Sequence, residues 1–352
     1  MRKLKLAVIG SGFWAGYQLA AWMEFSSEIE VIALYNRTIS KARKLAEHYG
    51  IPHCYDTVES LLSHEEPDFV DIITEVSTHE AFTKMAAKRG IPVICQKPMA
   101  DDLEAAQSML QECHEANIPL YIHENFRWQK PIRKMKELLN TGVIGKPFKA
   151  RVAYCSAFPV FENQPSLAEV EPFILTDIGS HIFDVCRFLF GEVKTIYCQT
   201  STVNKKIRGE DVANALMKMQ NGIQCFAEMS YASILEHESF PQTLVLVEGE
   251  FGSISLNKNF EIKVVTKNGV EIFYANPVVY EWADPLYAPV HSSIVDCNRN
   301  ILDALQGKGK AETTGEDNMK TVCLVWAAYE SARQNKVISM QEFYQHKTAN
   351  LI

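Results

Sequence analysis

The sequence predicts an α/β protein in which an N-terminal doubly wound parallel sheet is followed by an α+β domain with a large, open, mostly antiparallel sheet. Short apolar runs alternate with helical patterns over residues 1–124, and a glycine turn joins the first run to the first helix. Strand-like runs then dominate residues 146–266. Alternating strands and helices are typical of a parallel sheet. Because this pattern gives way to one dominated by strands, we expect two domains, 1–124 and 125–352.

The N-terminal strands are nearly continuous in apolar residues, which is typical of strands that are buried on both faces. The helices expected between them end at Gly50 and Gly90, residues that suit a helix terminus. The expected strands are 4–10, 30–35, 69–74, 91–95 and 118–123, and the expected helices are 13–24, 39–50, 79–90 and 101–117.

The C-terminal half has a β-rich pattern. Asn221-Gly222 separates two alternating runs, which predicts a hairpin. The expected strands are 146–157, 192–203, 211–219, 223–232, 242–248, 252–256 and 261–266, and the expected helices are 129–140, 176–190, 291–306 and 316–334.

The composition is that of an ordinary globular protein, with 352 residues, 47% of them hydrophobic, and a net charge of -8. The densest basic run, NKKIR at 204–208, is expected to be a solvated turn, and we expect no nucleic-acid partner. No run approaches the ~20 apolar residues of a membrane span, and the apolar stretch at the start is too short for a signal peptide. We therefore expect a cytoplasmic protein without a membrane partner.

The nine cysteines form no CxxC pair, and most of them lie in apolar runs. This pattern favours buried free thiols in a reducing compartment over disulfides. No two candidate ligands have the spacing of a zinc site, so no metal is expected.

The glycine turn GSGFWA at residues 10–15 matches the dinucleotide fingerprint GxGxxA. Gly10 would make the tight turn, Gly12 would let the backbone approach a pyrophosphate, and Ala15 takes the small position where the helix packs on the strand. The motif alone is a weak signal, since a tight turn needs no ligand. Its position between a first strand and a first helix makes cofactor binding the favoured interpretation.

The second strand ends in LYNRT, where NAD-binding folds usually carry an acidic residue for the ribose 2′-hydroxyl. Asn36 and Arg37 instead tolerate a 2′-phosphate, and Thr38 and Lys41 could assist. This favours NADP modestly over NAD. In the alternative, Arg37 stacks on adenine and Asn36 still binds a plain ribose.

Lys97 lies in ICQKPMA, directly after the strand 91–95. Ligands of open α/β sheets bind beyond the carboxyl ends of the strands, and Pro98 restricts the backbone there. A lysine at this place could stabilise negative charge on a substrate oxygen. On this stretch alone, a surface lysine would be the default interpretation.

Asp177 and His181 in TDIGSHIFD are four residues apart, on one face of an expected helix. Such pairs are more often structural than catalytic. Alcohol oxidation with a nicotinamide, however, needs a base for the hydroxyl proton while a hydride passes to the ring. Lys97 and His181 would provide the charge and the base, and Asp177 would orient the imidazole or contact a hydroxyl.

These motifs resemble, in order and over essentially the whole chain, the glucose–fructose oxidoreductase / inositol dehydrogenase (Gfo/Idh/MocA) family. The similar segments are LKLAVIGSGFWA, EVSTHEAF, QKP, TDIGSH and TTGEDNMKTVCLVWAAYESAR. The resemblance implies an NAD(P)-dependent oxidoreductase that acts on the CH–OH group of a sugar or polyol. It also implies a homodimer or homotetramer formed through the open sheet.

The resemblance carries the family's Glu-Lys-Pro motif onto Gln96, Lys97 and Pro98, and its Asp-x-x-x-His motif onto Asp177 and His181. It implies that Lys97, His181 and Asp177 are catalytic. The cofactor is expected to contact the residues of the glycine turn and LYNRT and further residues that the resemblance implies. This set is Gly10, Gly12, Phe13, Trp14, Ala15, Asn36, Arg37, Lys41, Thr74, His79, Gln96, Lys97 and Asn125. Those expected to contact the substrate are Lys97, Glu124, Arg127, Tyr154, Phe158, Asp177 and His181.

Several of these assignments have alternatives. His79 could be a surface residue at a helix start, and Asn125 and Arg127 could hold the domain junction. Gln96 replaces the family's glutamate, and EVEPFILTD replaces a glycine-rich segment, so the substrate does not transfer from well-known members.

Since no Arg/Lys cluster suits a phosphosugar, a neutral monosaccharide, polyol or lactone is the expected substrate. The alternative functions are a non-catalytic dinucleotide-sensing regulator, which would not need Lys97 and His181, and an enzyme of this fold that reduces imines or unsaturated substrates or acts on glycosides.

Overall fold

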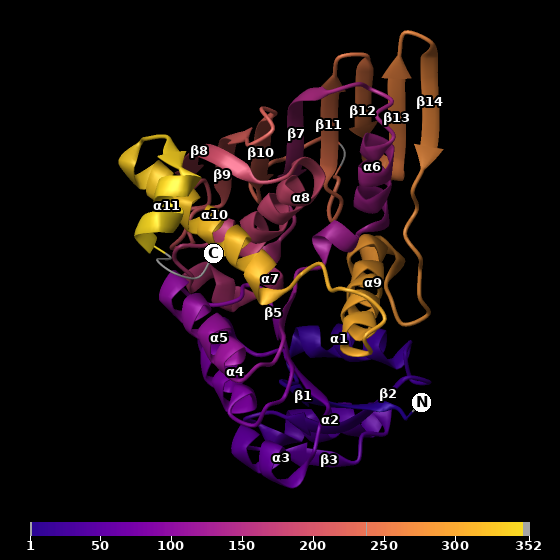
Figure 1. The fold of residues 1–352 in the computed structure, drawn as a ribbon, viewed down its shortest axis with the longest axis vertical. Coiled ribbons are helices and arrows are strands. Elements are labelled where there is room, and N and C mark those ends of the chain that lie inside the picture. Colours follow the sequence, from indigo (N-terminus) through magenta and orange to yellow (C-terminus); the bar gives the residue numbers. More distant parts are fainter. Residues whose placement is uncertain (1, 237, 348–352) are drawn as a thin grey trace. The chain divides into compact units, whose positions relative to one another are not determined.

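The computed structural model describes residues 2–236 and 238–347, and the chain divides into two compact units (Figure 1). Unit 1 contains the chain up to Glu124 together with Glu281–Ala283 and Ile294–Lys320. Unit 2 contains Asn125–Tyr280, Asp284–Ser293 and the chain from Thr321 onward.

Unit 1 contains a six-stranded parallel sheet of order β3-β2-β1-β4-β5-β6, which confirms the doubly wound expectation. The order reverses at β1, so the crevice where such folds bind ligands lies at the carboxyl end of this strand. The strands are β1 Leu4–Ile9, β2 Ile29–Tyr35, β3 His53–Tyr55, β4 Phe69–Ile72, β5 Val93–Gln96 and β6 Leu120–His123.

The helices that follow these strands are close to the expected ones. They are α1 Phe13–Met23, α2 Ile39–Tyr49, α3 Val58–His64, α4 His79–Ala87 and α5 Leu103–Glu115. Gly50 terminates α2 in a left-handed conformation, and Asp102 caps α5 by accepting a hydrogen bond from the Ala105 amide. The sequence did not predict β3 and α3, because both are short.

A buried polar network crosses the core of unit 1. The fully buried Asp71 carboxylate, on β4, accepts hydrogen bonds through Oδ2 from Trp22 Nε1 (2.8 Å) and Gln18 Nε2 (3.0 Å). Gln18 Nε2 also lies 3.1 Å from Asn298 Oδ1, which His123 Nε2 approaches at 3.0 Å. Burial raises the pKa of Asp71 to about 6, against the two hydrogen bonds that lower it.

Unit 2 contains a nine-stranded sheet of order β14-β13-β12-β11-β7-β10-β9-β8-β15 (Figure 1). All pairs are antiparallel except β7 with β10, which confirms the expected, mostly antiparallel sheet. The strands are β7 Pro147–Cys155, β8 Val193–Ser201, β9 Val212–Met219, β10 Gln224–Ser230, β11 Leu244–Gly249, β12 Gly252–Leu256, β13 Glu261–Thr266, β14 Gly269–Tyr274 and β15 Ile338–Ser339.

One face of this sheet is covered by helices. The alternating burial puts Cys225, Ala150 and Val247 on the covered face, where α6 (Lys130–Asn140) and α8 (Ser180–Phe190) contact it (Figure 1). The remaining helices are α7 Val160–Asn163, α9 Ala288–Leu305, α10 Gly315–Gln334 and α11 Met340–Lys347. The Asn221-Gly222 hairpin between β9 and β10 is confirmed, with Gly222 at φ +95°.

All nine cysteines are free thiols. The basic run 204–208 lies in the loop between β8 and β9, where Lys205 Nζ donates to the Thr202 carbonyl. Over residues 2–236 and 238–347, no helix is both long and apolar enough to cross a bilayer.

Candidate functional site

The glycine turn connects β1 to α1. Gly10 has φ +124°, and a Cβ there would lie 2.3 Å from the backbone oxygen of Ile73, so only glycine fits this crossing. A Cβ on Gly12 would meet nothing within 4 Å, which leaves open space at the start of α1 for a ligand. No side chain caps this helix start, and Phe13 is 71% exposed beside it, whereas Ala15 is fully buried. These features fit a pyrophosphate held by the α1 amides, and Trp14 lies in the same first turn.

Asn36 and Arg37 follow directly after β2. Asn36 Oδ1 accepts a hydrogen bond from the Thr38 amide at 2.9 Å. This bond uses one of the two acceptor positions of the Asn36 oxygen, and the side-chain NH2 group can donate to a ligand. Arg37 and Lys41 are both exposed, so this turn offers donors and positive charge at the surface.

Four expected residues lie at the ends of strands, along the same edge of the unit 1 sheet as the glycine turn: Thr74, Gln96, Lys97 and Glu124. Thr74 follows β4, Gln96 is the last residue of β5, and Lys97 is the next residue. Glu124, fully buried, follows β6. Because these neighbouring strands are parallel, their carboxyl ends share one edge.

His79 is buried and is not the surface residue that was one alternative. Its Nδ1 lies 3.0 Å from the Pro98 carbonyl oxygen and 3.3 Å from that of Met99, and its Nε2 lies 3.2 Å from the Thr74 carbonyl oxygen. Burial lowers the pKa of His79, against the carbonyls that raise it. The imidazole therefore packs between the Lys97 turn and the segment that follows β4. In its neutral form it carries one N–H and donates a hydrogen bond to only one of these two sides.

Gln96 is buried, and its Nε2 has no hydrogen-bond partner among the residues the structure describes. A buried amide donor of this kind costs about 1–3 kcal/mol when it is left unsatisfied. An orphan donor beside Lys97 fits a ligand with an acceptor oxygen.

Asp177 and His181 lie where a π-helical turn, Leu175–Gly179, passes into α8. Such turns occur frequently at functional sites. The carboxylate Oδ2 of Asp177 accepts a hydrogen bond from the Tyr231 hydroxyl at 2.9 Å. The imidazole of His181 stacks on the Phe126 ring, with centroids 3.8 Å apart and planes 8° apart. The sequence did not single out Phe126 or Tyr231, because neither belongs to the motif of its partner.

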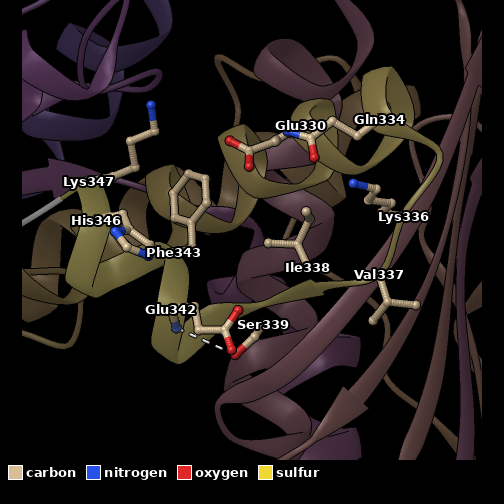
Figure 2. A pocket seen from close by; sticks show the side chains of 10 residues that line it. All are labelled: Glu330, Gln334, Lys336, Val337, Ile338, Ser339, Glu342, Phe343, His346 and Lys347. Atoms are coloured by element: carbon tan, nitrogen blue, oxygen red, sulfur yellow. Dashed lines mark hydrogen bonds between the residues drawn. The ribbon is translucent and has the colours of Figure 1, made fainter.

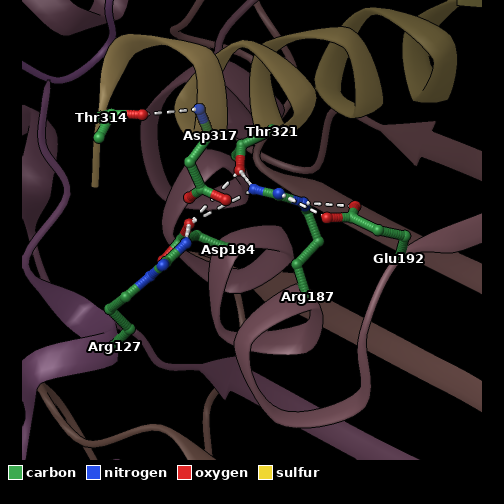
Figure 3. Close-up of polar contacts among 7 residues, drawn as sticks. All are labelled: Arg127, Asp184, Arg187, Glu192, Thr314, Asp317 and Thr321. Carbon is green, nitrogen blue, oxygen red and sulfur yellow. Dashed lines mark hydrogen bonds and ion pairs between the residues drawn. The ribbon is translucent and has the colours of Figure 1, made fainter. Parts of the chain in front are cut away.

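Arg127 forms a buried ion pair with Asp184 of α8 (Figure 3). Its Nε donates to Asp184 Oδ2 at 2.7 Å, and its Nη2 donates to Oδ1. In the same unit, Arg187 binds both carboxylate oxygens of Glu192 at 2.9 Å and the Thr321 hydroxyl at 2.7 Å. These contacts agree with the alternative that Arg127 has a structural role.

The other expected residues of unit 2 lie on separate elements. Asn125 Nδ2 donates to Ser293 Oγ at 2.8 Å, at the start of α9. Tyr154 is buried on β7, and its ring lies 6.3 Å from that of Tyr231. Phe158 stacks on Phe240 in the segment after β7, with centroids 3.7 Å apart.

A separate hollow of about 250 Å³ lies among α10, β15 and α11 (Figure 2). None of the expected site residues lines it. Its lining is Glu330, Gln334, Lys336, Val337, Ile338, Ser339, Glu342, Phe343, His346 and Lys347. Across the part of the chain that is described, no group of three or more His, Cys, Asp or Glu side chains could hold a metal ion.

Comparison with known proteins agrees with this geometry. Residues 4–123 match the model of the oxidoreductase family with an NAD-binding Rossmann fold, and residues 132–255 match that of the GFO/IDH/MocA C-terminal domain. The chain is 40% identical to D-apiose dehydrogenase of Rhizobium rhizogenes, over 97% of this chain and 98% of that protein. It is 38% identical to D-apiose dehydrogenase of Paraburkholderia graminis, over 97% and 91%.

A crystal structure of an oxidoreductase from Agrobacterium radiobacter, in complex with NAD+, L-tartaric acid and magnesium, superposes with a TM-score of 0.94. It is 40% identical, and the match covers 97% of this chain and 99% of that one. The expectation drawn from the sequence motifs is thus confirmed, and the chain belongs to the Gfo/Idh/MocA family of NAD-binding oxidoreductases.

Proposed function

We propose that this protein is an NAD(P)-dependent dehydrogenase that oxidises a CH–OH carbon of a neutral sugar, with D-apiose as its substrate. The observation that carries the proposal is that the glycine turn and Lys97 lie at the same edge of the unit 1 sheet. The full-length similarity to two D-apiose dehydrogenases supports the choice of sugar. QKP at residues 96–98 and HENFRW at residues 123–128 also resemble that branch of the family.

In this proposal Lys97 and His181 act on the same carbon. When bound, the nicotinamide supplies the hydride transfer. The Lys97 ammonium donates to the substrate oxygen and stabilises its developing negative charge, while His181 accepts the hydroxyl proton. Asp177 orients either the substrate or the imidazole. Glu124, which is buried at the end of β6, provides a further polar contact.

Tyr154 and Phe158 offer ring surface and one hydroxyl for a sugar. Arg127 and Asn125, with their contacts to Asp184 and Ser293, are proposed to support unit 2 instead of binding ligands. This arrangement leaves few cationic groups for a phosphate, which supports a neutral substrate.

The cofactor specificity follows from the turn after β2. Asn36 presents an uncharged side chain with a donor group, and Arg37 adds positive charge. An uncharged donor and a cation accommodate a 2′-phosphate, whereas the carboxylate usual at this place would repel it. We therefore propose that NADP is accepted at least as well as NAD, and that Asn36→Asp shifts the preference toward NAD.

The open face of the unit 2 sheet is proposed to form a homodimer or homotetramer. Leu216, Phe226 and Leu246 lie in one row across β9, β10, β7 and β11, with Arg151 between the last two of them. Each of the three apolar side chains is more than a third exposed. Exposed apolar rows of this kind mark interaction surfaces. Phe226→Glu should lower the molar mass measured by light scattering, whereas a chain that is already monomeric would show no change.

A panel of aldoses and polyols, assayed with each cofactor by nicotinamide absorbance, tests the proposal. D-apiose should give the highest kcat/KM. A regulatory protein that only senses the dinucleotide would bind the cofactor and give no absorbance change with any sugar. A cytoplasmic location is part of the same proposal and is tested by cell fractionation.

A further inference from the structure

The imidazole of His181, the proposed base, stacks in parallel on the Phe126 ring. Their centroids are 3.8 Å apart, and both residues are only 5% exposed. Phe126 lies in the turn Phe126–Trp128, and His181 lies in the first turn of α8. A full-face contact of this kind leaves the imidazole little freedom to rotate about its last side-chain bond.

A chain of aromatic contacts continues from this stack to Asp177. The Phe126 ring lies 6.1 Å from Tyr154, and Tyr154 lies 6.3 Å from Tyr231 in an edge-to-face arrangement. Centroid distances in this range are typical of favourable aromatic pairs. Tyr231 then donates its hydroxyl to Asp177 Oδ2 at 2.9 Å. The rings come from separate segments of unit 2, so they fix the two polar groups relative to the sheet.

The Tyr231 hydroxyl, at the end of this chain of contacts, keeps its proton. Burial, followed by the charge of Asp177, raises the pKa of Tyr231 well above its usual value. The hydroxyl therefore keeps its proton and can donate to the carboxylate throughout the range in which the enzyme would work.

The π-helical turn that carries Asp177 is held by one contact from α10 and one local contact. The Leu175 amide donates to the Tyr329 hydroxyl at 3.0 Å, and the Thr176 hydroxyl donates to the Phe173 carbonyl at 2.9 Å. With the backbone held, the remaining freedom at this site is side-chain rotation. That is the freedom which Phe126 and Tyr231 restrict.

We propose that Phe126 and Tyr231 are positioning residues, which hold the His181 imidazole and the Asp177 carboxylate in the orientation needed for proton transfer. This inference rests on the proposed function. Proton transfer requires the accepting nitrogen to point at the hydroxyl, and small misplacements of catalytic groups cost up to about 100-fold in rate. Neither residue needs to touch the substrate for this role.

The test compares Phe126→Leu, Tyr231→Phe and a control, Phe343→Leu, which truncates a Phe of equal burial on α11. Phe126→Leu should lower kcat about 10- to 100-fold, and Tyr231→Phe about tenfold, with KM and cofactor Kd within about twofold of wild type. Phe343→Leu should keep the wild-type kcat. Tyr231→Phe removes one oxygen only, so it remains informative even if Phe126→Leu does not fold.

NMR of histidine-labelled protein gives a readout that needs no substrate. The His181 ring signals, assigned with His181→Gln, should be displaced by the ring current of Phe126 and should move in Phe126→Leu. A wild-type kcat in folded Phe126→Leu or in Tyr231→Phe would overturn the proposal, as would unmoved His181 signals. If wild type turned over no sugar, the proposed function would fail, whereas the NMR comparison would still decide whether the Phe126 ring lies against the His181 imidazole.

Discussion

The buried carboxyl of Asp71 makes the stability of this protein depend on pH in an unusual direction. Burial raises its pKa to about 6, compared with the usual 3.8. Between about pH 4 and pH 6 the native state holds a proton that the unfolded chain has released, so the free energy of unfolding falls as the pH rises through this window. At 1.36 kcal/mol per pKa unit, this difference lowers the free energy of unfolding by about 3 kcal/mol, and the whole decrease is present at pH 8.

Asp71→Asn removes the titration and keeps an acceptor oxygen for Trp22 Nε1 and Gln18 Nε2. Its amide nitrogen would take the place of Oδ1, which has no partner among the described residues. Near pH 4, variant and wild type should therefore have similar free energies of unfolding. At pH 8 the variant should be more stable than wild type by about 2–3 kcal/mol, since it carries no buried charge.

Urea unfolding at pH 4, 6 and 8 measures this difference, provided that the m-values of the two proteins agree. Asp68→Asn is the control, because the ion pair with Arg2 lowers the pKa of Asp68. Loss of this pair should lower the free energy of unfolding by up to about 1 kcal/mol at pH 8. An Asp71→Asn variant whose stability relative to wild type is the same at pH 4 and pH 8 would refute the reasoning.

Three further predictions follow from contacts within single units. His79→Leu removes the imidazole contacts with the carbonyls on both sides of the Lys97 turn. It should lower the free energy of unfolding by about 2 kcal/mol and also lower kcat/KM. Wild-type denaturation and kinetics in this variant would show that His79 does not support the turn. Arg127→Ala should lower the free energy of unfolding, measured with denaturant, by about 3 kcal/mol. If Arg127 instead contacted the substrate, the substitution would raise KM and leave the stability unchanged. Cys186 and Cys225, whose sulfurs lie 3.7 Å apart in the core, should resist a thiol reagent until the chain unfolds, and rapid native labelling would contradict their burial.

The fold could be predicted because its signals are local. Continuous apolar runs marked the parallel strands, and Gly50 and Asn221-Gly222 marked a helix end and a hairpin. Strand β14 was missed because most of its residues are exposed on both faces, so burial leaves no alternating pattern in its sequence. The assignment of 294–320 to unit 1 depends on contacts far apart in the chain, such as Gln18 with Asn298, which no local pattern reports.

The candidate site was predictable to the extent that topology determines it. Since parallel strands share a carboxyl edge, residues that follow strands, such as Lys97, could be expected together with the glycine turn. The supporting partners could not be expected. Asp184 lies 57 residues from Arg127, and Tyr231 lies 54 residues from Asp177. Such pairs are set by packing within unit 2 and leave no spacing in the sequence.

The central claim is that Lys97 and His181 serve one reaction. A double-mutant cycle on kcat/KM for D-apiose, with Lys97→Met, His181→Ala and the combined variant, tests it most directly. Groups that act as a unit are strongly non-additive, so each single variant should lose about 1,000-fold or more and the combined variant little further, with cofactor Kd nearly unchanged. Losses that multiply, or a single variant within about tenfold of wild type, would contradict the account.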